Sequence, residues 1–180
     1  MSYRACVSVA LSFAVGLGLV TLSAQQPTKS AVPGVTNFAR VETTIACGGA
    51  TTTEAFPELK KMGFKSVINL RQASEKGVNI PEAEAAAKAA GLTYLHIPFD
   101  GAKPDPAVAD RFVAEITKPA NNPSYVHCAS ANRAAAMWMI KRLTVDHWDV
   151  AKASTEAEGL GLTNAALKDF AIKYAEAHKH

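Results

Sequence analysis

The segment YVHCASANRAAAMWMIKRL, residues 125–143, decides how the rest of the chain is interpreted. A short apolar run, Ser124–His127, leads directly into Cys128, and Arg133 follows five positions later at the start of a helical pattern. A strand, a tight loop of small residues and a helix N-terminus together form an anion site, because the loop N–H groups converge and the helix dipole adds partial positive charge. We expect a cysteine in this setting to ionise readily and to act as a nucleophile.

The composition fits one folded domain. The chain has 180 residues, of which 48% are hydrophobic and 19% are charged, so it can bury a core of ordinary size. The net charge of +3 comes from scattered Lys and Arg, and no basic run predicts a nucleic-acid partner. No spaced cluster of His, Cys, Asp and Glu predicts a metal site, and no motif predicts a cofactor.

The N-terminal residues are typical of a targeting segment. Residues 1–24 predict a signal peptide, with a positive start, an apolar stretch over 5–20 and a small-residue cleavage site before Gln25. Residues 25–36 contain two prolines and are interpreted as a linker, and the folded domain is expected over 37–178. The alternative is an uncleaved membrane anchor, because the apolar stretch approaches spanning length. With cleavage, the protein is expected in the periplasm or outside the cell, without attachment to a membrane.

Strands and helices alternate from residue 38 to residue 127. This pattern predicts an α/β domain with a mostly parallel central sheet flanked by helices, followed by a helical C-terminal third. Strands are expected over 38–41, 43–47, 65–70, 94–99 and 124–127. Helices are expected over 51–62, 81–90, 106–116, 133–143, 148–158 and 163–174.

Three of the expected strands end in side chains suited to chemistry. Arg71, Asp100 and Cys128 each follow a strand, and ligands of such sheets bind beyond the carboxyl ends of the strands. Asp100 is a candidate general acid, although Asp-Gly is also an ordinary turn signal. Asp105 is the second candidate acid, and a helix N-cap explains it equally well. Arg71 either supports the site or forms a surface ion pair.

The residues between Cys128 and Arg133 lack any bulky side chain that could block an anion. The planar fork of Arg133 is suited to binding two oxygens of a phosphoryl or sulfuryl group. His127 is expected either to order the loop by hydrogen bonding or to be a satisfied core histidine. The predicted anion-binding loop consists of Ala129, Ser130, Ala131 and Asn132.

Cys47, which precedes Gly48 and Gly49, is the second cysteine of the expected mature chain. One interpretation is a reversible disulfide with Cys128 that would protect the nucleophile from further oxidation. The alternative is a small buried hydrophobic residue, which is a common role for cysteine.

Three segments in this order resemble the cysteine-dependent phosphatases of the dual-specificity type. They are GFKSVINLR at 63–71, YLHIPFDG at 94–101 and VHCASANR at 126–133. They are most similar to the bacterial beta-lactamase hydrolase-like phosphatase family, over about residues 37–174. The resemblance implies that Cys128 is the nucleophile that forms a phosphocysteine. It also implies that Arg133 binds the oxyanion and that Asp100 is the acid.

The loop departs from that pattern in three ways. Four residues separate Cys128 from Arg133, where tyrosine and dual-specificity phosphatases have five, and the shorter spacing resembles single-domain rhodaneses. Ala131 stands where a glycine is expected, and Ala134 stands where Ser or Thr often follows the arginine. We therefore expect an exported cysteine-dependent hydrolase of a phosphate ester. The alternatives are a rhodanese-like sulfurtransferase with a cysteine persulfide and a catalytically weak pseudophosphatase that binds anions.

Overall fold

The computed structural model describes residues 26–41 and 43–178, so the predicted signal peptide over 1–24 lies outside the described residues. The strands are β1 Thr28–Lys29, β2 Ala39–Val41, β3 Ile45–Gly48, β4 Ser66–Asn69, β5 Thr93–His96 and β6 Ser124–His127. The α-helices are α1 Phe56–Lys61, α2 Ile80–Ala89, α3 Pro106–Ile116, α4 Asn132–Thr144, α5 Val150–Leu160 and α6 Ala165–Ala177. Two short 3₁₀ helices are η1 Thr53–Ala55 and η2 Pro119–Asn121.

The strands form one mixed sheet in the order β1-β2-β3-β6-β4-β5. The four strands from β3 to β5 are parallel, whereas β1 and β2 add an antiparallel edge. This confirms the predicted α/β fold with a mostly parallel sheet and a helical C-terminal third. Strand β1 falls inside the segment interpreted as a linker, so residues 28 and 29 belong to the sheet.

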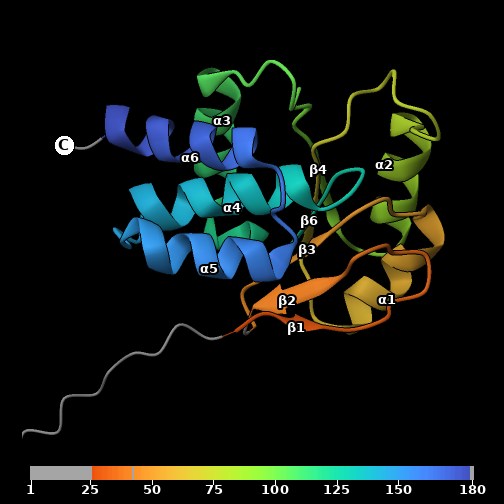
Figure 1. Ribbon diagram of the computed structural model, residues 1–180. Coiled ribbons are helices and arrows are strands. Elements are labelled where there is room, and N and C mark those ends of the chain that lie inside the picture. The colour runs from red at the N-terminus through yellow and green to blue at the C-terminus, as the bar shows by residue number, and fades with distance from the viewer. Residues whose placement is uncertain (1–25, 42, 179–180) are drawn as a thin grey trace, which may run out of the picture.

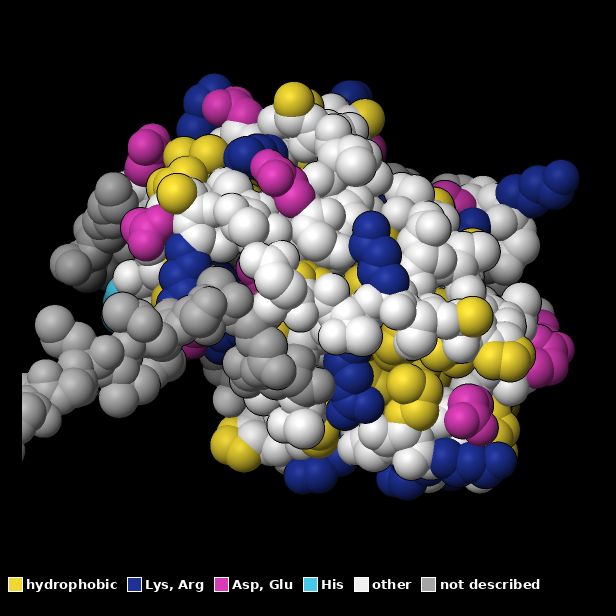
Figure 2. All heavy atoms as spheres, turned by 60° about the horizontal axis from the view of Figure 1, so that its bottom comes forward, with side chains coloured by type: hydrophobic (Ala, Val, Ile, Leu, Met, Phe, Trp, Pro, Cys, Tyr) yellow, Lys and Arg dark blue, Asp and Glu magenta, His cyan; other side chains and the backbone are white. Residues whose placement is uncertain are grey.

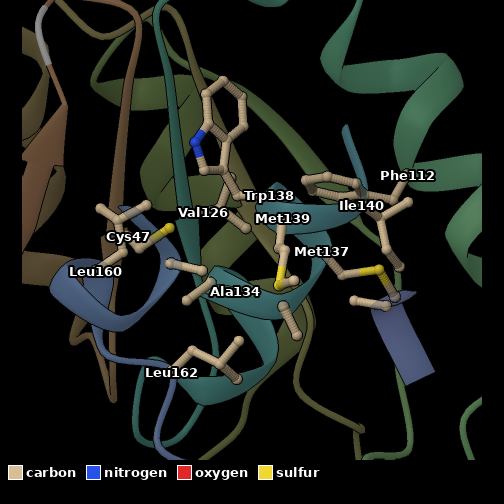
Figure 3. Packing of buried hydrophobic residues seen from close by; sticks show 14 of the residues in the cluster. Cys47, Phe112, Val126, Ala134, Met137, Trp138, Met139, Ile140, Leu160 and Leu162 are labelled. Atoms are coloured by element: carbon tan, nitrogen blue, oxygen red, sulfur yellow. The ribbon is translucent and has the colours of Figure 1, made fainter. Parts of the chain in front are cut away.

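Alternation along the strands divides the core into two layers (Figure 1). On one face, Cys47, Ile68 and Val126 pack beneath helices α3 to α6, and Figure 3 shows this layer around α4. On the other face, Val67 and Tyr125 pack with their neighbours against α1 and α2. The catalytic candidate Cys128 belongs to the first layer, because it continues the alternation of β6.

Most of the helix ends follow from residues that can cap them. The side chains of Asn79, Asp105 and Asp149 accept hydrogen bonds from the first-turn N–H groups of α2, α3 and α5. Asn164 caps α6, so this helix begins at Ala165 rather than at the predicted residue 163. Thr51 donates its hydroxyl to the Gly49 carbonyl, and the helix predicted over 51–62 is divided into η1 and α1.

The outer surface of the described chain carries no concentrated basic stripe on the face drawn in Figure 2. Lys and Arg side chains lie singly there between polar and hydrophobic neighbours.

Among residues 26–41 and 43–178, no helix is both long and apolar enough to cross a membrane. The same residues hold no group of three His, Cys, Asp or Glu side chains that could bind a metal ion.

Candidate active site

The loop between β6 and α4 surrounds the thiol of Cys128, which is fully buried. The Cys128 N–H donates to the Gly48 carbonyl at 3.2 Å, so the start of the loop is fixed to the neighbouring strand. Within the described part of the chain, the N–H groups of Ala129, Ser130, Asn132 and Arg133 donate to no protein oxygen. Unpaired donors at a helix N-terminus are the groups that bind an anion in such loops.

The family resemblance implies a glycine at position 131, and Ala131 has a backbone conformation that favours glycine. It precedes α4 with φ of 77° and ψ of −17°, in the left-handed region, and its side chain is fully buried. A residue with a Cβ atom loses about 1–2 kcal/mol in this conformation relative to the right-handed one. The loop therefore keeps its shape in spite of the alanine, because the contacts around it impose that shape.

Contacts on both sides hold the loop in place. On one side, the Ala50 N–H donates to the Ala129 carbonyl at 2.9 Å. On the other side, the Asn132 side-chain oxygen accepts from the N–H groups of Thr163 and Asn164 at 2.7 and 2.8 Å. Asn132 was predicted to be a member of the anion-binding loop, and its side chain fastens that loop to the connection between α5 and α6.

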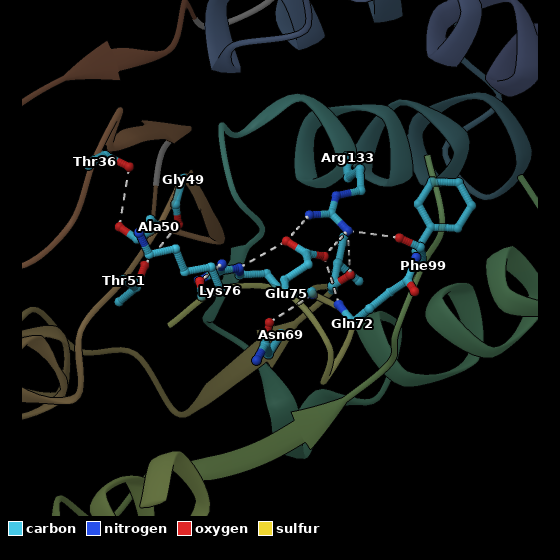
Figure 4. Close-up of polar contacts among 12 residues, drawn as sticks. Thr36, Gly49, Ala50, Thr51, Asn69, Gln72, Glu75, Lys76, Phe99 and Arg133 are labelled. Carbon is cyan, nitrogen blue, oxygen red and sulfur yellow. Dashed lines mark hydrogen bonds and ion pairs between the residues drawn. The ribbon is translucent and has the colours of Figure 1, made fainter. Parts of the chain in front are cut away.

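Arg133 lies beside Cys128 and is held by Glu75 (Figure 4). Its Nη1 and Nη2 atoms donate to the two carboxylate oxygens of Glu75 at 2.7 and 2.9 Å, and Nη1 also faces the carbonyls of Leu70 and Phe99. Among the described residues, no oxygen accepts from Nε. The Nη1–Nη2 edge of the fork is therefore occupied, and the Nε side remains for a ligand.

Arg133 and Glu75 each stabilise the charged form of the other. Burial opposes the charge on Arg133, but the bond to Glu75 and the neighbouring Cys128 raise its pKa above the ordinary value. Burial would raise the pKa of Glu75, but hydrogen bonds from Arg133, the Gln72 N–H and Arg71 lower it to about 2. The carboxylate thus stays ionised at neutral pH and keeps the guanidinium in one orientation.

Arg71 supports the site through the same carboxylate. Its Nε donates to Glu75 at 3.1 Å, and its Nη2 donates to the Lys76 carbonyl at 2.7 Å. The end of β4 thus places one arginine on the far side of the Glu75 carboxylate from Arg133. The side chain forms an ion pair, as the alternative expected, and its supporting role in the site stays a prediction.

The loop-ordering role of His127 stays a prediction. Neither buried ring nitrogen makes a well-formed hydrogen bond in the described structure, although the backbone of Gly49 and Cys128 lies near the ring, which stacks on Tyr125 with centroids 5.7 Å apart. Burial and the positive charge of Arg71 lower its pKa to about 3, so the ring is neutral. His127 lies in the layer opposite Cys128, at the wall of a cavity of about 270 Å³ that also contacts Asn69.

Asp100, one candidate acid, lies in the turn after β5, and Asp105, the other, lies directly before α3. They border the same shallow cavity, which also contacts Gln72 and Ser74. Asp100 is exposed and accepts from the Ala102 N–H at 2.9 Å, while Asp105 caps α3. The Phe99 carbonyl, just before Asp100, accepts a hydrogen bond from Arg133 at 2.9 Å. This bond brings the turn close to Arg133 and the anion-binding loop. Both acid assignments stay predictions.

Cys47 is a buried residue of the core beneath α4 and α5 (Figure 3). Its register partner on β6 is Val126, two residues before Cys128, so both thiols face the same layer. Burial, followed by the neighbouring Cys128, raises the pKa of the Cys47 thiol. Both cysteines are free, and the disulfide between them stays a prediction.

Glu75 is the residue of the site that sequence reasoning missed. It is the only acidic residue in the loop over 73–79, four residues after Arg71. That position is a weak signal, because the pairing depends on Arg133, which lies 58 residues away in the chain.

Comparisons with known proteins identify the family and the fold. The sequence model of one protein family matches residues 37–145. That family is described as the phosphatase-like domain of the beta-lactamase hydrolase-like protein. The beta-lactamase hydrolase-like protein of Agrobacterium fabrum is 29% identical over 103 residues, which are 56% of this chain and 24% of that protein. The chain spans about a quarter of the length of the curated relatives it matches.

Two solved structures show the same fold. A DUF442 protein of Shewanella putrefaciens CN-32, described as a candidate phosphatase, has a TM-score of 0.69 at 22% identity, covering 82% of this chain and 94% of its own. The catalytic domain of the PP-IP phosphatase Siw14 from S. cerevisiae has a TM-score of 0.65 at 18% identity, covering 80% and 88%. With the matched residues spanning β2 to β6, the cysteine loop and α4, the chain belongs to the beta-lactamase hydrolase-like phosphatase family.

Proposed function

We propose that the protein is a cysteine-dependent phosphatase that hydrolyses a phosphate ester outside the cytoplasm. One observation carries the proposal: Arg133 is fixed beside Cys128 with no oxygen bonded to its Nε among the described residues, at a loop in which four N–H groups are unpaired. Family membership and the phosphatase-like fold support it. Export rests on the sequence of residues 1–24 alone.

The proposed reaction has two steps. The thiolate of Cys128 attacks phosphorus, the phosphorus–oxygen bond to the leaving group breaks, and Asp100 donates a proton to the departing oxygen. The loop N–H groups and Nε of Arg133 stabilise the negative charge on the equatorial oxygens. Water then cleaves the phosphocysteine, which releases inorganic phosphate and restores the thiol.

The spacing of the loop keeps sulfur transfer as a second candidate. Four residues lie between Cys128 and Arg133, and a smaller cradle is suited to a cysteine that carries a sulfane sulfur. In that reaction Arg133 would hold the anionic donor and no phosphate would form. Ala131 and Ala134 favour a third candidate, a protein that binds an anion without turnover.

One comparison separates the three candidates. Reduced protein, with Cys128→Ser as the control, is assayed with an aryl phosphate and with thiosulfate plus cyanide. We expect phosphate release from the wild type and none from the variant. Thiocyanate formation without phosphate release would replace the proposal with sulfur transfer, and binding of sulfate without any turnover would replace it with a pseudophosphatase.

The role of the acid is tested by the leaving group. Asp100→Asn should reduce kcat/KM by about 10²–10⁴-fold for an alkyl phosphate, whose leaving oxygen needs a proton. The same change should affect p-nitrophenyl phosphate much less, because nitrophenolate leaves without protonation. Asp105→Asn is the matched control, and the same leaving-group dependence in that variant alone would transfer the role to Asp105.

A further inference from the structure

Two adjoining cavities lie beside the loop, at the carboxyl edge of the sheet. Both contact Thr51, Thr52, Arg71 and Gly77. The first, of about 270 Å³, extends toward α2, and the second, of about 430 Å³, extends toward Thr36 and Ala50. They differ in charge, and this difference bears on what each could bind.

The cavity on the α2 side disfavours an anion. Its lining includes Glu54 and Glu82 beside the single cation Arg71, and the neutral ring of His127 forms part of its wall. The cavity toward Thr36 contains Arg71 and Lys76 and no acidic side chain. A negatively charged group at this edge of the sheet is therefore favoured in the second cavity.

The second cavity adjoins the predicted phosphate loop. Ala50, which lines it, donates its N–H to the Ala129 carbonyl at 2.9 Å, and Gly49 pairs with Ser130. Figure 4 shows Ala50, Thr51 and Lys76 on one side of Glu75 and Arg133 on the other. A group in this cavity would thus be a neighbour of a phosphoryl group held by the loop.

The side chains around Glu75 have a net positive charge that could attract a negatively charged group in the second cavity. Arg71, Arg133 and Lys76 contribute three positive charges, and Glu75 contributes one negative charge, which leaves a net charge of +2. Among the described residues, the Nζ atom of Lys76 has no hydrogen-bond or ion-pair partner. Hydrogen bonds to Glu75 and to the Lys76 carbonyl fix the orientation of Arg71. The ammonium group of Lys76 is therefore the cation that is available to a ligand.

We propose that the cavity formed by Thr36, Ala50, Thr51, Arg71 and Lys76 binds a second phosphate group of the substrate. The inference rests on the proposed function, because it places the transferred phosphoryl group in the Cys128 loop. The substrate class is then a small molecule with at least two phosphate groups. Lys76 is a specificity-determining residue that contacts the group which is not transferred.

Calorimetry tests the subsite without turnover. The ligands are inorganic phosphate, methylenebisphosphonate and propane-1,3-bisphosphonate, whose two spacings allow for the unknown separation of the groups. We expect at least one bisphosphonate to bind the wild type about tenfold more tightly than phosphate, as one added charge-assisted contact would produce. Lys76→Ala should remove this advantage and leave the affinity for phosphate unchanged.

Lys65→Ala is the matched control, since Lys65 is an exposed lysine at the opposite end of β4. It should leave all three affinities unchanged. Equal affinities for phosphate and both bisphosphonates in the wild type would overturn the proposal, and so would an equal effect of Lys76→Ala and Lys65→Ala.

The assay of phosphate release is scored separately from binding. A protein that shows the Lys76-dependent advantage but releases no phosphate from any ester would keep the subsite and lose the proposed reaction. A protein that hydrolyses esters but shows no advantage would keep the reaction and lose the subsite.

Discussion

The two ends of α4 each carry an arginine held by a glutamate, but the two side chains differ in what their Nε atoms contact. Arg142 donates from Nε and Nη2 to Glu156 at 2.7 and 3.1 Å and from Nη1 to Asp146 at 3.0 Å. Among the described residues, Arg133 donates to oxygen atoms only from Nη1 and Nη2, and its guanidinium also contacts the Cys128 thiol. Both side chains have the same exposure of 12%, so burial alone does not distinguish them.

The surroundings of the two pairs explain their different roles. The Arg142 guanidinium lies over the rings of Trp138 and Trp148, and Glu156 also accepts from the Trp138 indole at 2.6 Å. Every strong donor in that cluster therefore has a partner. At the loop end, by contrast, Arg133 lies among unpaired N–H groups. Satisfied buried groups stabilise a fold, whereas unpaired groups at a helix N-terminus are available to a ligand.

The largest expected effect separates the two arginines directly. Arg133→Lys should lower kcat/KM for an aryl phosphate by about 10²–10³-fold, because an ammonium group cannot replace the planar fork at the equatorial oxygens. Its melting temperature should change little. Arg142→Lys, the matched change at the other end, should lower the melting temperature and keep kcat/KM per folded molecule. Equal kinetic effects would remove the distinction drawn here.

Replacing each glutamate should give the same pattern as replacing the arginine that it holds. Glu156→Gln removes a fully buried charge from a paired cluster and should reduce the free energy of unfolding by about 3 kcal/mol. Glu75→Gln, at a partly exposed site, should reduce the free energy of unfolding less than Glu156→Gln does but lower kcat/KM about tenfold, because Arg133 loses its fixed orientation. Urea denaturation and steady-state kinetics measure the two quantities. A larger stability loss in Glu75→Gln would contradict the comparison.

The unpaired histidine at the loop end predicts a dependence of stability on pH. The pKa of His127 is about 3 in the folded chain, against 6.5 for an ordinary histidine. Below pH 6.5 the unfolded chain therefore binds a proton that the folded chain does not, and the free energy of unfolding falls as the pH falls. The slope is at most about 1.4 kcal/mol per pH unit, or about 2 kcal/mol between pH 6.5 and 5.

Urea midpoints at pH 7, 6 and 5 test this dependence. His127→Phe, which keeps a ring over Tyr125, should lose most of the slope, and the exposed His147→Gln should retain it. The low pKa of Glu75 adds a further loss only below pH 4.5, so it does not interfere in this range. An unchanged slope in His127→Phe would show that His127 is protonated in the folded state.

The smallest expected effect concerns the strained alanine. Ala131→Gly should raise the free energy of unfolding by up to about 1 kcal/mol, because glycine adopts a φ of 77° without the steric cost that alanine bears. Ala136→Gly, within α4, should instead destabilise by about 1 kcal/mol or more. Destabilisation of both variants would mean that the alanine at position 131 is not strained.

Much of the fold could be predicted from sequence because the signals are local. The apolar runs that become β4 and β6 and the Asp105 cap before Pro106 depend on neighbouring residues. The glycine-like position of Ala131 was implied by the family resemblance. Strand β5 ends at His96, earlier than predicted, where Pro98 follows closely. Cap choices between adjacent residues, such as Thr163 and Asn164, were beyond the reach of a pattern.

The site was predicted less completely because its polar contacts are long-range. Cys128 and Arg133 could be identified together since one loop contains both. The pairing of Arg133 with Glu75 depends on how β4 and β6 lie side by side, which a single sequence does not specify. The missing partners of His127 likewise follow from the packing of both layers.

The most direct test of the account is the mass of the protein during turnover. Reduced wild-type protein is mixed with an aryl phosphate, quenched in acid within the first turnovers and digested for mass spectrometry. We expect the peptide that contains Cys128 to gain the mass of one phosphoryl group, and the same peptide to stay unmodified in Cys128→Ser. Phosphate release from the wild type without any adduct on Cys128, or undiminished release by Cys128→Ser, would contradict the proposed thiolate mechanism.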